Sequence, residues 1–139
     1  MKYLTDYTQQ AQTEMFNELG VFFAFSNEQF EEGLIKVRKN GILNKGEKLT
    51  RFSNLNGMFA PSKNAKEVVE RLKKIQIEGR KKDIAENGKE KIIERELHNH
   101  ECFYTGDITD AVDKVKNYGY TYDDVLKIYR EKYQNVASS

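Results

Sequence analysis

Two histidines and one cysteine carry the most obvious chemistry in this sequence. His98, His100 and Cys102 lie within five residues of one another, and the chain has no other residue of either type. Imidazole and thiolate are common ligands of zinc. On a strand, this spacing would place all three on one face. The flanking sequence has helical periodicity, however, and residues two apart on a helix point about 200° away from each other. His98 and Cys102 then share a face that His100 does not join.

A zinc site would need ligands that the sequence does not supply. Structural zinc takes four, usually Cys and His, and no second cluster of these residues exists. We therefore predict no metal ligand, no catalytic residue and no cofactor. We expect His100 and Cys102 to pack against the core as a helix ends, and Tyr104 to fix the following turn. A metal-dependent or acid–base enzyme centred on His98, His100 and Cys102, with Glu101 beside them, is an alternative function.

Cationic side chains are concentrated in the middle of the chain. Residues 1–35 hold one Lys and six acidic residues, residues 36–95 hold seventeen Lys and Arg against eight acidic residues, and residues 96–139 hold five against eight. The net charges are −5, +9 and −3, and such asymmetry bears on partners rather than on fold. Cationic helix faces contact phosphates. We predict that the surface which binds a partner or nucleic acid consists of Lys45, Lys48, Arg51, Lys66, Arg71, Lys73, Lys74, Arg80, Lys81 and Lys82.

The elements that position these side chains are mostly helices. Apolar residues recur every three or four positions over 5–19, which predicts a helix that Gly20 ends. Ser26 and Gln29 have the spacing of a capping box, which predicts a second helix over 27–40.

Strands are predicted on either side of this second helix. The apolar run at 21–25 is readable as a buried strand, and a hairpin is predicted from 48–52 and 58–60 around the turn dipeptide Asn56-Gly57. Together they would form a two- or three-stranded antiparallel sheet, and these elements make up the region 1–60.

Basic helices follow over 62–100, with a break at Asn87-Gly88. A helical hairpin is predicted over 107–135, capped by Asp107 and by Thr121 with Asp124. The fold class is therefore α+β and mostly α, with about five helices in a single compact domain of residues 1–139 that ends in a flexible tail at 136–139.

Composition suggests a cytoplasmic location. One cysteine forms no internal disulfide, no apolar run approaches the ~20 residues of a membrane span, and the first residues lack the layout of a signal peptide. We expect no membrane partner.

Two segments resemble an uncharacterised family of small proteins from bacteria and their phages. They are FFAFSNEQFEEG at 22–33 and NHECFYTGD at 99–107. The activity of that family is unknown, so the resemblance assigns no functional residue. It implies a mobile-element setting, in which small proteins without catalytic motifs are often antagonists of host defence.

We therefore predict a non-enzymatic binding protein of phage or prophage type that inhibits a host defence factor, for example as an anti-CRISPR protein. Its partner would be a host protein or ribonucleoprotein, such as a CRISPR nuclease, or the RNA of that complex. A phosphate backbone and an acidic protein groove attract the same side chains, so both stay open. An accessory protein that binds RNA or DNA is a further alternative, and the oligomeric state is not specified by the sequence.

Overall fold

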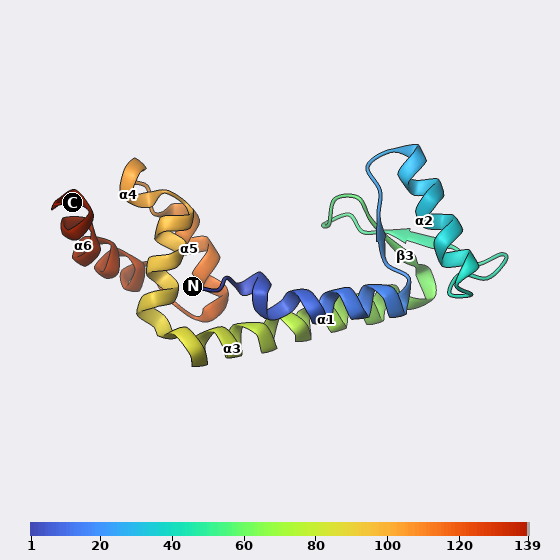
Figure 1. The fold of residues 1–139 in the computed structure, drawn as a ribbon, viewed down its shortest axis with the longest axis horizontal. Coiled ribbons are helices and arrows are strands. Elements are labelled where there is room, and N and C mark those ends of the chain that lie inside the picture. Colours follow the sequence, from blue (N-terminus) through green and yellow to red (C-terminus); the bar gives the residue numbers. More distant parts are fainter. Residues whose placement is uncertain (139) are drawn as a thin grey trace. The chain divides into compact units, whose positions relative to one another are not determined.

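The computed structural model describes residues 1–138, with side chains up to Gln134, and is drawn in Figure 1. Its helices and strands confirm the predicted α+β class, mostly α, with six α-helices rather than about five. In chain order the elements are α1 (Leu4–Leu19), β1 (Phe22–Phe23), α2 (Asn27–Lys39), β2 (Leu49–Arg51), β3 (Met58–Pro61), α3 (Ala65–Asn99), α4 (Cys102–Thr105), α5 (Thr109–Val115) and α6 (Tyr122–Ser138), with 3-10 turns at Ser62–Asn64 and Lys116–Tyr118.

Two compact units divide the chain, Met1–Gly79 and Arg80–Ser139, and each has its own apolar core. Helix α3 contributes its first part, 65–79, to the first unit and its remainder, 80–99, to the second. The prediction of a single compact domain stays a prediction. Among residues 1–138, no helix has both the length and the apolar character that crossing a membrane requires.

Helix α1 packs one apolar face into the core of the first unit. Met15 and Leu19 are buried there, together with Thr8, which the sequence pattern did not mark. Gly20 adopts φ 78° and ends the helix, as predicted, because a left-handed residue at this position is easiest for glycine. Figure 1 shows α1 running alongside the first part of α3.

The predicted three-stranded antiparallel sheet is confirmed, with strand order β1-β3-β2. Phe22 pairs with Phe59, which on its other side pairs with Arg51, so these three residues form a row across one face of the sheet. The opposite face carries Met58 and Ala60, which are buried in the core of the first unit.

Helix α2 covers the face that carries Phe22, and its start is fixed by local hydrogen bonds. The backbone N–H of Gln29 donates to Ser26 Oγ over 3.2 Å, as the predicted cap requires. The Gln29 side chain accepts from the backbone N–H of Phe25 over 2.7 Å, one residue before its partner in an ordinary capping box. At Gly33 the helix approaches the sheet closely, since a Cβ there would lie 2.2 Å from Phe22 Cδ2.

The predicted break at Asn87-Gly88 is confirmed. Gly88 has φ 79° and ψ 165° inside α3, a conformation that is almost restricted to glycine. The helix therefore changes direction here, within the second unit, and the last segment of α3 begins at Lys89. Buried residues of this part, Ile92, Ile93 and Leu97, form the centre of the second core.

Helices α5 and α6 form the predicted C-terminal hairpin. Asp124 N–H donates to Thr121 Oγ1 over 3.2 Å and Thr121 N–H donates to Asp124 Oδ2 over 2.9 Å, so the predicted capping box is confirmed. Asp107 Oδ1 accepts the backbone N–H of Thr109 over 2.9 Å at the start of α5. Helix α6 continues through Ser138, over most of the segment 136–139 predicted as a flexible tail, and Ser139 lies outside the described residues.

Candidate functional site

The cluster of His98, His100 and Cys102 does not converge on one point. Cys102 is fully buried in the apolar core of the second unit, as predicted, and burial raises the pKa of its thiol. His98 is exposed and lies 3.8 Å from Glu94 Oε1 through its Nε2. Within residues 1–138, no group of three or more His, Cys, Asp or Glu is arranged to share a metal ion.

The prediction for Tyr104 is wrong. Its side chain is 92% exposed and does not fix the turn between α4 and α5. The backbone makes this region instead: the N–H groups of Tyr104 and Thr105 both donate to Glu101 O over 3.0 Å, and Gly106 N–H donates to Cys102 O over 2.8 Å. A four-residue helix closed by its own backbone bonds leaves the ring free to point outward.

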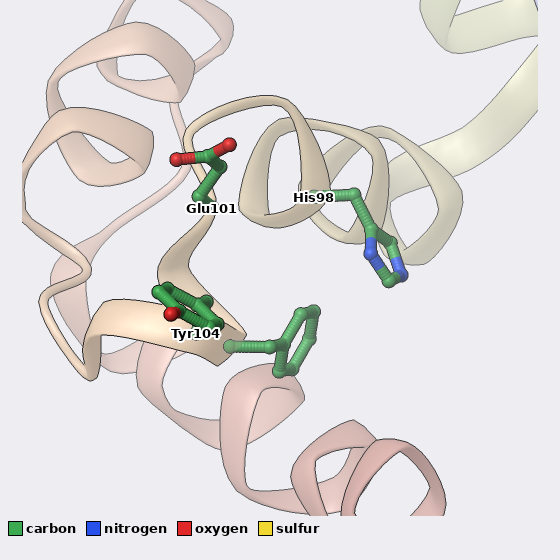
Figure 2. A pocket seen from close by; sticks show the side chains of 4 residues that line it. His98, Glu101 and Tyr104 are labelled. Carbon is green, nitrogen blue, oxygen red and sulfur yellow. The ribbon is translucent and has the colours of Figure 1, made fainter. Parts of the chain in front are cut away.

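A shallow cavity of about 390 Å³ lies where α3 gives way to α4, and Figure 2 shows its lining. His98 and Phe103 face each other with ring centroids 4.9 Å apart, whereas Glu101 and Tyr104 point away from the imidazole. Within the described part of the chain, no hydrogen bond joins His98 to Glu101. The two groups therefore do not form an acid–base pair, and this geometry does not favour the enzyme alternative.

Glu101 is the only non-glycine residue among residues 1–138 with positive φ (56°). A left-handed backbone conformation destabilises the folded state by about 1–2 kcal/mol when the residue has a Cβ. Glycine avoids this strain but loses more backbone entropy on folding, so the substitution removes only part of the destabilisation. We expect Glu101→Gly to raise the free energy of unfolding by about 0.5–1 kcal/mol, measured by urea denaturation. Glu131→Gly, in the exposed face of α6, is the matched control and should lower it by about 1 kcal/mol. A loss of stability in Glu101→Gly would show that the carboxylate makes a stabilising contact.

A buried polar network lies in the second unit, and no pattern in the sequence predicted it. The Arg95 guanidinium donates two hydrogen bonds to Asp83, Nη1 to Oδ1 over 2.9 Å and Nη2 to Oδ2 over 3.0 Å. Tyr118 Oη donates to Asp83 Oδ2 over 2.6 Å, and Asn87 Nδ2 donates to Oδ1 over 2.8 Å. Such a bidentate pair in the core is a fixed structural feature of this unit.

The network shifts the pKa values of its members. Burial raises the pKa of Asp83, but hydrogen bonds from Arg95, Tyr118 and Asn87 outweigh it, so the pKa is lowered overall. Burial and the bond to Asp83 raise the pKa of the Tyr118 hydroxyl. Glu96 also lies in the network, with Oε1 3.3 Å from Arg95 Nε. The Asp83 carboxylate and the Arg95 guanidinium are therefore charged at neutral pH, whereas the Tyr118 hydroxyl keeps its proton.

The ten predicted binding residues are divided between the two units. Seven lie in Met1–Gly79, and Arg80, Lys81 and Lys82 lie in Arg80–Ser139. Of the ten, only Arg71 forms an ion pair within the described residues, 2.8 Å from Glu18 Oε2. That all ten residues form one surface stays a prediction.

On the first part of α3, Lys66, Lys73 and Lys74 lie within about 100° of one another around the helix axis. All three are exposed, on the side opposite buried Val68. None of them forms an ion pair with any residue that the structure describes. Glu70 lies on the same face, which keeps a net positive charge. We call the three lysines the basic face of α3.

Arg51 belongs to β2, which forms one edge of the sheet, and not to α3. It borders a second cavity, of about 310 Å³, between the start of α2 and the sheet. The row Phe22, Phe59 and Arg51 places the guanidinium beside an aromatic surface. Sequence reasoning selected Arg51 for its charge but missed the aromatic neighbours, because strand register brings them together.

Comparisons with known proteins identify a family but no activity. No curated protein and no solved structure matches the chain. The sequence profile of DUF7659, described as a family of unknown function, matches residues 4–135. This match confirms the expectation of an uncharacterised family and covers both units, so the chain belongs to the DUF7659 family.

Proposed function

We propose that this chain is a non-enzymatic binding protein whose basic face of α3 contacts the phosphate backbone of a nucleic acid or nucleoprotein. One observation carries the proposal: Lys66, Lys73 and Lys74 share one exposed helix face and no described carboxylate pairs with them. Unpaired ammonium groups on one face give a field that attracts an anion.

Phosphate chemistry fits this face better than a small-molecule reaction does. Lysine ammonium groups on flexible stems act as point charges that follow a backbone without reading its sequence. Binding of this kind releases counterions and weakens steeply as salt rises. Among the described residues of the first unit, no group of three or more His, Cys, Asp or Glu is arranged to hold a metal ion beside the bound molecule.

A narrower form of the proposal concerns the biological partner. The partner would be a host defence factor that carries nucleic acid, such as a CRISPR nuclease with its guide RNA, and the protein would inhibit it in the cytoplasm. The resemblance of 22–33 and 99–107 to a family of small proteins from bacteria and their phages supports this form. Co-purification of the tagged chain with a nuclease complex from a bacterial host would test it.

Removing the basic face should weaken binding in a salt-dependent way. We expect the triple variant K66A/K73A/K74A to bind a fluorescein-labelled 12-mer of oligouridine at least tenfold more weakly at 50 mM salt. The slope of log K against log salt should become shallower by about 2, since each lost contact to single-stranded nucleic acid removes about 0.7. Fluorescence anisotropy between 50 and 200 mM salt measures both quantities.

Lys114→Ala is the matched control, because Lys114 is an exposed lysine of α5 in the other unit. Its affinity and salt slope should equal those of the unchanged protein. Equal binding by the triple variant and the control would contradict the proposal. So would tight binding that is insensitive to salt, since it would require contacts other than phosphate neutralisation.

A further inference from the structure

The cavity beside Arg51 combines an aromatic wall with polar groups. The rings of Phe30 and Phe59 meet edge to face with centroids 5.1 Å apart, and Phe22 stacks on Phe59 at 5.5 Å. Phe25 also lines the cavity, and its side chain is 69% exposed. A solvent-exposed aromatic ring at the rim of a cavity offers a face on which a flat ligand can stack.

The backbone around Phe25 is held on both sides while its ring stays exposed. Phe25 N–H donates to Gln29 Oε1 over 2.7 Å, and Ala24 N–H donates to Gly57 O over 2.8 Å. Gly57 lies against the ring, since a Cβ there would be 2.5 Å from Phe25 Cε1. The ring is therefore positioned before any ligand arrives, which reduces the entropy lost on binding.

The polar side of the cavity is formed by Arg51, Asn27 and Asn56. The Arg51 guanidinium makes no ion pair within the part of the chain that the structure describes. The two amide side chains likewise form no hydrogen bond with another described residue. A guanidinium group can bind an anion, and side-chain amides can hydrogen-bond to the polar edge of a flat ring. Beside exposed aromatic rings, these groups can together recognise a flat ligand that carries a negative charge close to its ring.

We propose that this cavity binds one nucleotide unit of single-stranded nucleic acid, with its base stacked on Phe25 and its phosphate held by Arg51. A volume of about 310 Å³ suits a single base rather than a base pair. Bases become available for stacking on protein rings when they are unpaired. The site rests on the proposed function, because the basic face of α3 belongs to the same unit and would contact phosphates of the same strand.

A tryptophan at position 25 gives a direct readout of stacking. The chain has no tryptophan, so Phe25→Trp introduces a single indole fluorophore. We expect oligouridine and oligoadenosine 12-mers to quench its emission in a saturable way. Polyphosphate of similar charge, which has no bases, should bind the basic face without quenching. Equal quenching by polyphosphate, or binding of the oligonucleotides without quenching, would overturn the proposal.

Two substitutions test the residues themselves. Phe25→Ala and Arg51→Ala should each raise the dissociation constant for the oligouridine 12-mer about tenfold, because the first removes the stacking ring and the second removes a charge-assisted bond to the phosphate. Phe23→Ala is the matched control, because Phe23 is also exposed but lies on the opposite face of the sheet. Unchanged affinity in Phe25→Ala and Arg51→Ala, with far-ultraviolet circular dichroism intact, would rule the site out.

The same measurements separate this site from the proposed function. If K66A/K73A/K74A weakens binding but Phe25→Ala and Arg51→Ala do not, the basic face stands and the nucleotide site falls. Adenosine and uridine monophosphates form a second arm: saturable quenching of Phe25→Trp by them, without oligonucleotide binding, would support the cavity and contradict the proposed function. Absence of both signals would overturn both proposals.

Discussion

Replacing Arg95 by alanine should lower the free energy of unfolding by about 3–5 kcal/mol. Arg95 is 94% buried and its side chain forms a bidentate pair with Asp83, which has no exposed surface. Without the guanidinium, Asp83 and neighbouring Glu96 would be two buried carboxylates with no cation between them. Removing one partner of a buried ion pair destabilises the fold much more than replacing both partners by apolar residues, because the remaining charge stays desolvated.

Urea denaturation of the full chain, followed by circular dichroism, measures this loss. Arg130→Ala is the control, since Arg130 is exposed on α6 in the same unit, and it should change stability by less than about 0.5 kcal/mol. The double variant Asp83→Leu with Arg95→Met should be more stable than Arg95→Ala, because it leaves one buried carboxylate fewer. A loss below about 1 kcal/mol in Arg95→Ala would mean that water reaches the network.

Acidification should reduce the difference between Arg95→Ala and the unchanged protein. The pKa of Asp83 is lowered in the folded state, so its contribution is complete above its unfolded pKa and is lost as pH falls through the lower folded value. The window therefore lies below 3.8, the ordinary aspartate value. In Arg95→Ala the Asp83 carboxyl group can take up a proton at a higher pH than in the unchanged protein. The urea midpoints of the two proteins should therefore become more alike as the pH is lowered.

Gly33→Val should lower the free energy of unfolding by about 2–3 kcal/mol. Helix α2 approaches the sheet so closely that a Cβ at this position would lie 2.2 Å from Phe22 Cδ2 and 2.6 Å from Cε2. The ring has little room to retreat, because it stacks on Phe59 and also meets Phe30. Glycine inside a helix normally lowers its stability relative to alanine, and at this position the close packing of the helix on the sheet explains its presence.

Glu32→Val is the matched control for that substitution. It places the same side chain one position earlier on α2, at an exposed site, and should cost less than about 1 kcal/mol. Thermal denaturation of both variants measures the difference. Combining Gly33→Val with Phe22→Ala should cost less than the sum of the single losses, because the two side chains compete for one space. Strict additivity would contradict the overlap.

Local signals in the sequence predicted where elements begin and end. Ser26 and the pair Thr121–Asp124 cap helices through residues three positions apart, and Gly20 and Gly88 adopt backbone conformations that few other residues tolerate. These features depend on neighbouring residues alone. They are therefore readable without knowing the tertiary structure.

Long-range pairings were not predictable in this way. Asp83 forms hydrogen bonds with Arg95, twelve residues later, and with Tyr118, thirty-five residues later. In the sequence Asp83 stands within a lysine-rich stretch, where a charged residue is expected to be solvent-exposed. Arg51 reaches the aromatic row only through strand register. Proximity in sequence predicts a role for Tyr104 in the turn, but the backbone closes that turn without its ring.

The bidentate pair and its tyrosine also constrain how the DUF7659 family can diverge. A single replacement at Asp83, Arg95 or Tyr118 leaves a buried polar group without its hydrogen-bond partner. A small folded unit has a low free energy of unfolding, so few such losses leave it folded. Related chains should therefore keep all three residues or exchange them together for apolar ones. These positions are expected to covary even where the surrounding surface lysines drift independently.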